Sequence, residues 1–288
     1  MQKQNIIYNT FFTTLILLFF FFKFTFAQEK PNIIFIMADD LGYGEVGAYG
    51  QLMIQTPNID RLSSRGIQFS DYYSGAAVCA PARSVLMTGL HTGHTRIRGN
   101  FGKGGVIGLA GKKGRVPLRE EDLTIAEVLQ DIGYRTGMIG KWGLGEPNTT
   151  GEPNKKGFDY FYGFYNQRRA HSYYPEYLWE NTHKVMLFGN EKEQNHQYTH
   201  SLFADKAINF IDRNHQTPFF LYLPVCIPHS RYELPDNGIY THKKGWTKLQ
   251  KKYAAMITRL DETVGRIVSR LEALGIDDNT YIFFTSDN

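Results

Sequence analysis

The sequence predicts an α/β fold in which a largely parallel sheet is covered by helices on both faces. Two observations lead to this prediction. Short apolar segments of the kind found in buried strands alternate along the chain with amphipathic helical segments. No internal repeat interrupts this alternation, so a solenoid or propeller is not indicated.

The first elements follow from apolar runs and from helix start and stop signals. PNIIFIMA (residues 31–38) is an isoleucine-rich run bounded by proline and by Asp39-Asp40, which indicates a buried strand. Residues 57–66 begin with proline and end with glycine, as short helices do. RTGMIG (residues 135–140) is a further strand, preceded by a predicted helix over residues 122–134 whose apolar positions are Leu123, Ala126, Val128, Leu129 and Ile132.

The second half of the chain repeats the same alternation. A helix is predicted over residues 201–213, and TPFFLYLPV after it is a strand. A long helix is predicted over residues 246–275, and NTYIFFTSDN forms the last strand. The apolar positions of the long helix are Ala255, Ile257, Leu260, Val264, Ile267, Leu271 and Leu274.

The N-terminal segment, residues 1–27, is predicted to be a secretory signal peptide cleaved after Ala27. It has an early Lys3, an apolar run from Phe11 to Phe22 and a small-x-small ending. The alternative is an uncleaved membrane anchor, but Lys23 interrupts a run that is short for a membrane span. We therefore expect export to the periplasm or the extracellular space, with residues 28–288 as one soluble domain and no stable membrane partner.

Charge and cysteine content exclude several classes of function. The net charge of the whole chain is +4, and loss of Lys3 and Lys23 leaves 30 basic against 28 acidic residues. This mild balance gives no reason to expect a nucleic-acid partner. Cys79 and Cys226 are the only cysteines. Two cysteines do not make a disulfide scaffold, and whether these two pair is left open.

Polar side chains follow four of the predicted strands, where a core would not place them. They are Asp39-Asp40, Lys141, His229 and Asp287-Asn288. In an open α/β sheet, ligands bind at the carboxyl ends of the strands, so we expect these groups to converge. Three carboxylates with an amide carbonyl suit Ca²⁺ or Mg²⁺ better than zinc. With the cations, such a site suits an anionic tetrahedral group, to whose leaving oxygen His229 could donate a proton.

The stretch AAVCAPARSVLMTGL (residues 76–90) places Cys79 at a predicted helix N-terminus, because Pro81 suits the first turn. A helix N-terminus favours a negative or polarised group, and Arg83 lies one turn further on. We interpret Cys79 as a nucleophile position at the mouth of an anion site. An unmodified thiolate is a weaker interpretation, because no His-Asp relay is evident from the spacing.

These motifs resemble the N-terminal part of a type I sulfatase of the alkaline-phosphatase-like superfamily. The resemblance covers residues 32–288 and rests on NIIFIMADDLGYGEVGAYG, the Cys-x-Pro-x-Arg core CAPAR with SVLMTGLHTGH, GYRTGMIGKWGLG and FFTSDN. It implies that a maturation enzyme oxidises Cys79 to formylglycine, whose hydrate attacks the sulfur of a sulfate ester. It also implies a calcium ion held by Asp39, Asp40, Asp287, Asn288 and an oxygen of residue 79.

The resemblance further assigns roles to the cations and defines a substrate. Arg83 would support the hydrate, Lys141 would contact sulfate, and His229 would face the leaving group. The substrate would be an aryl sulfate or a sulfated carbohydrate. A basic, glycine-rich segment at residues 99–114 and its neighbours would suit additional anionic groups, although a solvated basic loop is an equal alternative. The cations concerned are Arg96, Arg98, Lys103, Lys112, Lys113, Arg115, Arg168 and Arg169.

Two features depart from the family pattern. The family commonly has histidine two residues after the lysine of GKW, where this chain has Gly143. His171 and His94 are candidates to take over its role, and with Arg98 they are predicted substrate contacts. The chain also stops at Asn288, where the family continues with a further lysine and a C-terminal subdomain, so the sequence predicts an incomplete catalytic domain.

Two other functions remain open from sequence. One is hydrolysis of phosphate or phosphonate esters on the same scaffold. The other is a catalytically inactive sulfatase fragment that only binds anionic glycans.

Overall fold

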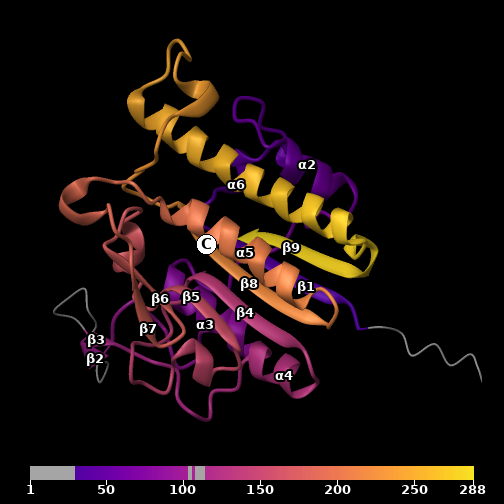
Figure 1. Ribbon diagram of the computed structural model, residues 1–288, viewed down its shortest axis with the longest axis vertical. Helices are drawn as coiled ribbons and strands as arrows, with labels where there is room; N and C mark the ends of the chain where they lie inside the picture. The colour runs from indigo at the N-terminus through magenta and orange to yellow at the C-terminus, as the bar shows by residue number, and fades with distance from the viewer. Residues whose placement is uncertain (1–29, 103–105, 108–113) are drawn as a thin grey trace, which may run out of the picture. The chain divides into compact units, whose positions relative to one another are not determined.

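A seven-stranded sheet forms the centre of the unit from Pro31 to Asn288 (Figure 1). Its strands are β1 (Asn32–Asp39), β4 (Arg135–Lys141), β5 (Tyr160–Phe164), β6 (Tyr177–Glu180), β7 (His183–Met186), β8 (Phe219–Pro228) and β9 (Thr280–Ser286). They lie in the order β7-β6-β5-β4-β8-β1-β9. The pairs from β5 to β9 are parallel, whereas β6 runs antiparallel to both β5 and β7. The prediction of a largely parallel sheet is confirmed.

β1 occupies an interior position of the sheet, between β8 and β9. Its Ile34 pairs with Leu221, and its Ile36 pairs with Leu223, all of them buried. A strand flanked by parallel neighbours and covered on both faces is a nearly continuous apolar run, and PNIIFIMA is such a run. The first charged residue of the strand, Asp39, comes at its carboxyl end.

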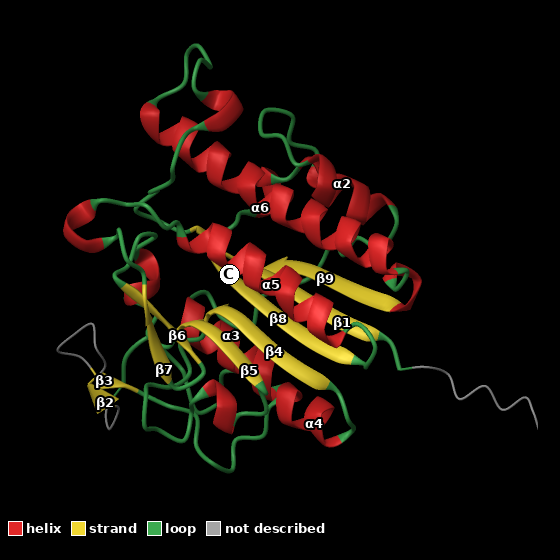
Figure 2. Ribbon diagram, viewed as in Figure 1, coloured by secondary structure: helices red, strands yellow, loops and turns green. Residues whose placement is uncertain are grey.

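Helices cover both faces of the sheet (Figure 2). They are α2 (Pro57–Ser64), α3 (Cys79–Thr88), α4 (Ile125–Asp131), α5 (Thr199–Asn214) and α6 (Lys248–Leu274). α5 and α6 share one core cluster with Leu221 of β8, and α2 packs on α6. α3 and α4 share the other cluster with Tyr222, the next residue of β8. Successive residues of a strand point to opposite faces, so the two clusters lie on opposite sides of the sheet.

The long helix α6 has clear signals at both ends. Thr247 accepts a hydrogen bond from the backbone N–H of Gln250, and the Gln250 side chain accepts one from the backbone N–H of Thr247, which forms a capping box. Gly275 ends the helix in the left-handed conformation, with φ of 67°. The prediction of residues 246–275 was therefore correct to within two residues at each end.

The helix predicted over residues 122–134 is shorter than expected. α4 begins after Thr124, which caps it through Glu127, and ends at Asp131. Ala126 is its only buried residue, whereas Leu123, Val128 and Ile132 are exposed. The apolar spacing overstated the helix because Leu123 precedes the cap and lies outside it.

The strands β5, β6 and β7 were not predicted. Their sequences mix aromatic residues with glycine and charged residues. β5 pairs with β4 in parallel, and β6 and β7 extend the sheet by antiparallel pairing. A separate two-stranded ribbon joins β2 (Val106–Ile107) to β3 (Gly114–Arg115) within the glycine-rich segment.

The computed structural model describes residues 30–102, 106–107 and 114–288. The predicted signal peptide, residues 1–27, and the cations Lys103, Lys112 and Lys113 lie outside the described residues. Within the described ranges, none of the helices combines the length and the apolar character that crossing a membrane requires.

Candidate functional site

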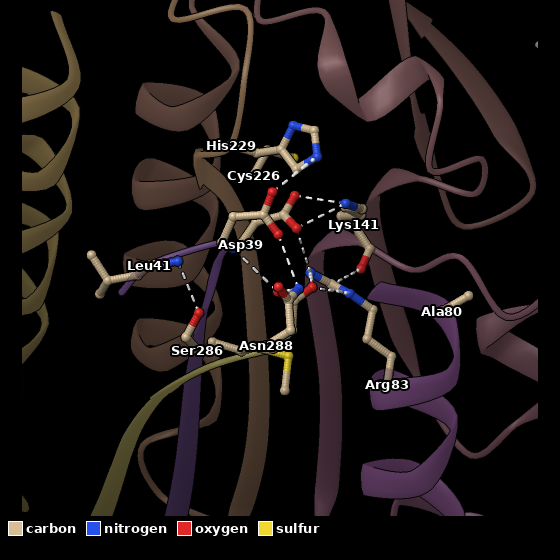
Figure 3. A network of polar contacts seen from close by, with 12 residues as sticks. Asp39, Leu41, Ala80, Arg83, Lys141, Cys226, His229, Ser286 and Asn288 are labelled. Carbon is tan, nitrogen blue, oxygen red and sulfur yellow. Dashed lines mark hydrogen bonds and ion pairs between the residues drawn. The ribbon is translucent and has the colours of Figure 1, made fainter. Parts of the chain in front are cut away.

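The carboxyl ends of the parallel strands bring together the polar residues predicted from sequence (Figure 3). Asp39 ends β1 and Lys141 ends β4. Asp287 follows β9 directly, and His229 follows β8. Because these four strands run in the same direction, their ends meet at one edge of the sheet. We call this group, with Asp40, Cys79, Arg83 and Asn288, the strand-end cluster.

Four side chains of the cluster form a buried ionic network. Lys141 Nζ lies 2.9 and 2.6 Å from the two carboxylate oxygens of Asp39. Arg83 donates through Nε and Nη2 to Asp287 Oδ2, at 3.1 and 2.7 Å. Arg83 also donates through Nη1 to the backbone oxygen of Lys141, at 2.6 Å. The side chains of all four are at most 1% exposed, so these contacts are shielded from water.

Charges of like sign also meet in this network. Burial raises the pKa of Asp39, the charge of Asp287 raises it further, and Lys141 opposes both. Burial would likewise raise the pKa of Asp287, but the charges of Arg83 and Lys141 outweigh it and hold that pKa below its usual value. With Asp40, the cluster has three carboxylates against two permanent cations. A further cation is therefore electrostatically favoured there.

The ligand atoms fit a divalent metal ion. One atom each from Asp39, Asp40, Cys79 and His229 lies within 4.8 Å of the others. The side-chain nitrogen of Asn288 donates to Asp40 Oδ1 at 2.9 Å, so the amide lies beside the same carboxylates. The carboxylate oxygens are hard donors that suit Ca²⁺, whereas the thiol and the imidazole of the same group suit softer metal ions. The carboxylates therefore fit the calcium ion that the sequence motifs imply, which would take an oxygen at residue 79 in place of the sulfur.

Not every predicted metal ligand belongs to this group of closely spaced ligand atoms. Asp287 is absent from the tight group of ligand atoms. Its Oδ2 accepts from Arg83, and its Oδ1 accepts from the backbone N–H of Asp40 and from Asn288. His229 joins the tight group instead, with Nε2 3.3 Å from Asp40 Oδ2. The ligand assignments of Asp287 and Asn288 stay predictions.

The loop after β1 carries Asp40 in an uncommon backbone conformation. Its φ is 62°, in the left-handed region that aspartate tolerates better than most residues. The N–H of the next residue, Leu41, donates to Ser286 Oγ at 2.9 Å. Contacts with the end of β9 thus hold the loop in place, so that consecutive carboxylates can turn toward the cluster.

Cys79 is the first residue of α3, as predicted. The preceding residue, Val78, has extended geometry and offers no side-chain cap. The next residue, Ala80, donates its backbone N–H to Asn100 Oδ1 at 3.0 Å. Burial raises the pKa of the Cys79 thiol to about 11, so an unmodified thiol is protonated at neutral pH. This argues against the interpretation as a thiolate nucleophile.

Two histidines stack at the edge of the cluster. The rings of His171 and His229 have centroids 4.0 Å apart and an interplanar angle of 22°. Burial and the charge of Lys141 lower the pKa of His171 to about 3, so this imidazole is neutral at physiological pH. His171, from the segment before β6, is therefore placed beside the site, as one of the two histidines proposed to act there.

His94 and Arg98 are not brought into the cluster. His94 is exposed and packs edge-on against His91, with centroids 4.6 Å apart. Arg98 donates to the backbone oxygens of Thr95 and Gly93, at 3.2 and 2.7 Å. Both side chains are thus engaged in the turn after α3, and their roles as substrate contacts stay predictions.

Gln167 is a residue that sequence reasoning missed. Gly143, which stands where the family commonly has histidine, has φ of 80°. A Cβ placed on it would lie 2.3 Å from Gln167 Nε2, so the glutamine side chain fills that space. Gln167 is 4% exposed, and its Nε2 has no hydrogen-bond partner among the described residues. Only the three-dimensional packing reveals this, because the two positions are far apart in sequence.

Comparison with known proteins agrees with the geometry. The family model described as Sulfatase matches residues 31–288. The chain belongs to the sulfatase family. It is 31% identical over 280 residues to N-acetylgalactosamine-6-sulfatase of Rattus norvegicus and 34% identical over 277 residues to an arylsulfatase of Hemicentrotus pulcherrimus. These alignments cover 91% and 90% of this chain, but 50% and 47% of the relatives. This sulfatase chain therefore spans about half the length of these curated relatives.

Solved structures show the same partial coverage. Ps i-CgsB in complex with k-i-k-neocarrahexaose has a TM-score of 0.76 and 33% identity, over 90% of this chain and 59% of that one. The sulfatase yidJ from Bacteroides fragilis, described as putative, has a TM-score of 0.71 and 28% identity, over 91% and 63%. The predicted sulfatase fold is thereby confirmed.

Proposed function

We propose that the whole protein hydrolyses sulfate esters of a sulfated carbohydrate, using formylglycine made from Cys79 and a bound calcium ion. One observation is the main support. Cys79, at the N-terminus of α3, lies within 4.8 Å of a group of metal-ligating atoms in a cluster that also holds two buried cations. A nucleophile position, a divalent-cation site and cations for an anionic group are thus together in one place.

The calcium ion, when bound, supplies positive charge that stabilises the oxygens of the sulfate group. Asp39 and Asp40 would hold it with Asp287, Asn288 and an oxygen of residue 79. Formylglycine, when formed, supplies a hydroxyl nucleophile in place of the thiol. The remaining work falls to side chains that orient the sulfate and move protons.

The chain's own side chains have separable tasks. Lys141 places its Nζ beside Asp39, where it can bind a sulfate oxygen while the carboxylate keeps it charged. Arg83 anchors Asp287 and the strand end of Lys141, which fixes α3 against the sheet. His229 has a side chain 12% exposed, so its ring remains accessible to a leaving-group oxygen that needs a proton.

A carbohydrate substrate is supported by relatives and by nearby cations. One relative is named for N-acetylgalactosamine 6-sulfate, and one similar structure contains a neocarrahexaose. Arg115 donates to the backbone oxygen of Asn100, whose side chain accepts from Ala80 next to Cys79, and its guanidinium stacks over Phe101 at 4.3 Å. The guanidinium of Arg169 stacks over Tyr177 at 4.0 Å. Cations held on aromatic rings can meet the additional anionic groups of a sulfated glycan.

Export and maturation complete the proposal. Residues 1–27 would direct the chain out of the cytoplasm, and a formylglycine-generating enzyme would act on Cys79 as a transient partner. The short sequence Cys79–Arg83 would be its recognition element.

Peptide mass spectrometry of protein from its own host tests the central step. Trypsin should release residues 66–83, and we expect the mass of formylglycine in place of cysteine at position 79. The matured protein should hydrolyse an aryl sulfate faster than the matching aryl phosphate. Replacement of Cys79 by alanine should lower turnover by at least about 10³-fold, since it removes the nucleophile. Plain cysteine at position 79, or equal turnover by Cys79→Ala, would overturn the mechanism.

A further inference from the structure

A pocket separate from the strand-end cluster lies beside the segment that follows His171. Its volume is about 430 Å³, and it lies where the segment before β6, the segment before α5, the loop after β8 and the first turns of α6 meet. The lining residues that matter here are Tyr174, His196, Tyr198, Glu233, Leu234 and Lys252. They come from four regions of the sequence, so only the fold assembles them.

Tyr198 is the first sign that this pocket binds a ligand. The residue is 4% exposed, and its hydroxyl has no hydrogen-bond partner among the described residues. A buried hydroxyl without a partner costs about 1–3 kcal/mol, so native proteins normally satisfy it. Its ring packs against Tyr174, with centroids 5.4 Å apart, which holds the hydroxyl in place. The hydroxyl is shielded from solvent, so a ligand hydroxyl supplies the missing partner only when the pocket wall moves aside.

The charged groups around the pocket indicate the chemistry of that ligand. Lys252 makes no side-chain hydrogen bond or ion pair within the described part of the chain, and its side chain is half-buried. Glu233 accepts a hydrogen bond from the backbone N–H of Tyr173 through Oε2, at 3.2 Å, which leaves Oε1 for a ligand. The half-buried ring of Tyr174 and the side chain of Leu234 add apolar surface.

This combination fits an anionic sugar. A sulfate or carboxylate group would pair with Lys252, and ring hydroxyls would bond to Glu233 and Tyr198. The apolar face of the sugar ring would pack on Tyr174. A purely apolar ligand would leave these polar groups desolvated without compensation.

A short segment connects the pocket to the strand-end cluster. His171, at its start, stacks on His229. The hydroxyl of Tyr173 lies 2.8 and 2.9 Å from the backbone oxygens of His229 and Cys226. Tyr174, the next residue, lines the pocket. One wall of the pocket and one wall of the cluster are therefore parts of the same short segment.

We propose that this pocket is a second saccharide subsite, which binds an anionic sugar unit in the same chain as the unit whose sulfate ester is cleaved. The proposal rests on the proposed function for its substrate class. It assigns to Lys252 and Tyr198 a role in the affinity for oligosaccharides and none in the chemical step.

The test is calorimetric binding in a Cys79→Ala background, which prevents turnover. The probes are a chondroitin 6-sulfate hexasaccharide, neocarrahexaose and the monosaccharide N-acetylgalactosamine 6-sulfate. We expect Lys252→Ala to raise the Kd of at least one hexasaccharide about tenfold, the loss expected for one charge-assisted contact. Tyr198→Phe, which keeps the ring, should raise it about threefold. Neither change should alter the Kd of the monosaccharide.

Lys251→Ala is the matched control, because it removes the same charge from the adjacent residue. Lys251 donates to the backbone oxygen of Thr241 and does not line the pocket. The hexasaccharide Kd of the Lys251→Ala variant should stay within about twofold of the parent value. Equal hexasaccharide affinity in the parent and in Lys252→Ala, or no binding of either hexasaccharide, would overturn the subsite. Failure of the proposed function would appear separately, as missing formylglycine and absent aryl sulfate turnover.

Discussion

Two regions of this protein bury ionisable groups, and they do so in opposite ways. In the layer of helices formed by α2, α5 and α6, Asp261 is 1% exposed. In the strand-end cluster, Asp39 is fully buried. Each carboxylate loses its hydration, which is costly unless the protein replaces the lost hydrogen bonds. The two regions differ in what replaces them.

Asp261 receives neutral donors only. Its Oδ1 accepts from the backbone N–H groups of Asn58 and Ile59 at 2.8 and 2.7 Å, and its Oδ2 accepts from Asn58 Nδ2 at 2.7 Å. These N–H groups belong to the first turn of α2, which has no side-chain cap from its own N-cap residue, Thr56. One carboxylate of α6 thus caps α2 and satisfies its own oxygens, which is a structural role.

Asp39 receives cations and lies beside a second carboxylate. Lys141 contacts both its oxygens, Arg83 lies 3.7 Å away, and the charge of Asp287 raises its pKa. Stability alone does not require this arrangement, because a buried ion pair is seldom better than a well-packed apolar pair. A buried carboxylate satisfied by neutral donors holds elements together, whereas carboxylates grouped around cations leave the site ready for a charged ligand.

The largest effect on stability is expected at Asp261. Replacement by alanine leaves the buried N–H of Ile59 and the part-buried N–H and side-chain amide of Asn58 without this acceptor. We expect a loss of about 3 kcal/mol in the free energy of unfolding, measured by urea denaturation. Aryl sulfate turnover per folded molecule should not change, because Asp261 lies outside the strand-end cluster. A loss below about 0.5 kcal/mol would contradict the structural role.

A smaller effect is expected from calcium. If the cluster binds Ca²⁺ only in the folded state, calcium at about 100 times its Kd should stabilise the protein by about 2.7 kcal/mol. Asp39→Asn should lose most of this increment, because the neutral amide binds calcium more weakly than a carboxylate. Thermal unfolding with calcium and with a chelator measures the difference.

The helical layer provides the control for calcium. Asp261→Ala should keep the full calcium increment despite its lower stability, since it removes no charge from the cluster. An equal calcium increment in Asp39→Asn and in the parent protein would show that the ion binds elsewhere.

The smallest effect is expected from His200 of α5, which is also in the helical layer. Burial lowers its pKa to about 4, while Nε2 lies 2.9 Å from Thr263 Oγ1. Between about pH 6.5 and pH 4 the unfolded chain binds a proton that the folded chain does not. Stability should therefore fall as the pH falls through this window and level off below it.

We expect His200 to contribute about 1–2 kcal/mol to that fall, less than the full pKa difference because of relaxation around the ring. His200→Gln should reduce the slope of unfolding free energy between pH 6.5 and pH 4. The same slope in the variant and the parent would assign the pH dependence to other groups.

Much of the site was predictable because its residues follow strands. Asp39 and Lys141 come where buried apolar runs end, and Asp287 comes where the partly exposed edge strand β9 ends. Parallel strands bring such ends together whatever the details of packing. The position of Cys79 at the start of α3 followed from Pro81 for a similarly local reason. Each of these inferences needed only the hydrophobic period of a segment, the residue at which the segment ends, and the rule that parallel strands end at one edge of the sheet.

Contacts between distant segments were not predictable. Gln167 fills the space beside Gly143, and His171 stacks on His229, yet neither pair has a signal in the sequence. Arg98, predicted as a substrate contact, donates to the backbone of its own turn, and that contact has no signal in the sequence either. Charge in a sequence does not say which direction a side chain takes.

The sequence by itself thus determined the α/β class, the order of the main strands and helices, and the residues at the strand ends. Hydrophobic period and helix signals are local properties of the chain, so they can be seen without a fold. Only the tertiary structure decided which carboxylate meets which cation, that His229 lies beside Asp40, and that Tyr198 and Lys252 line one pocket. Those outcomes depend on packing between segments that are distant in sequence. The free energy of such contacts is set by burial and geometry and does not depend on the local sequence pattern.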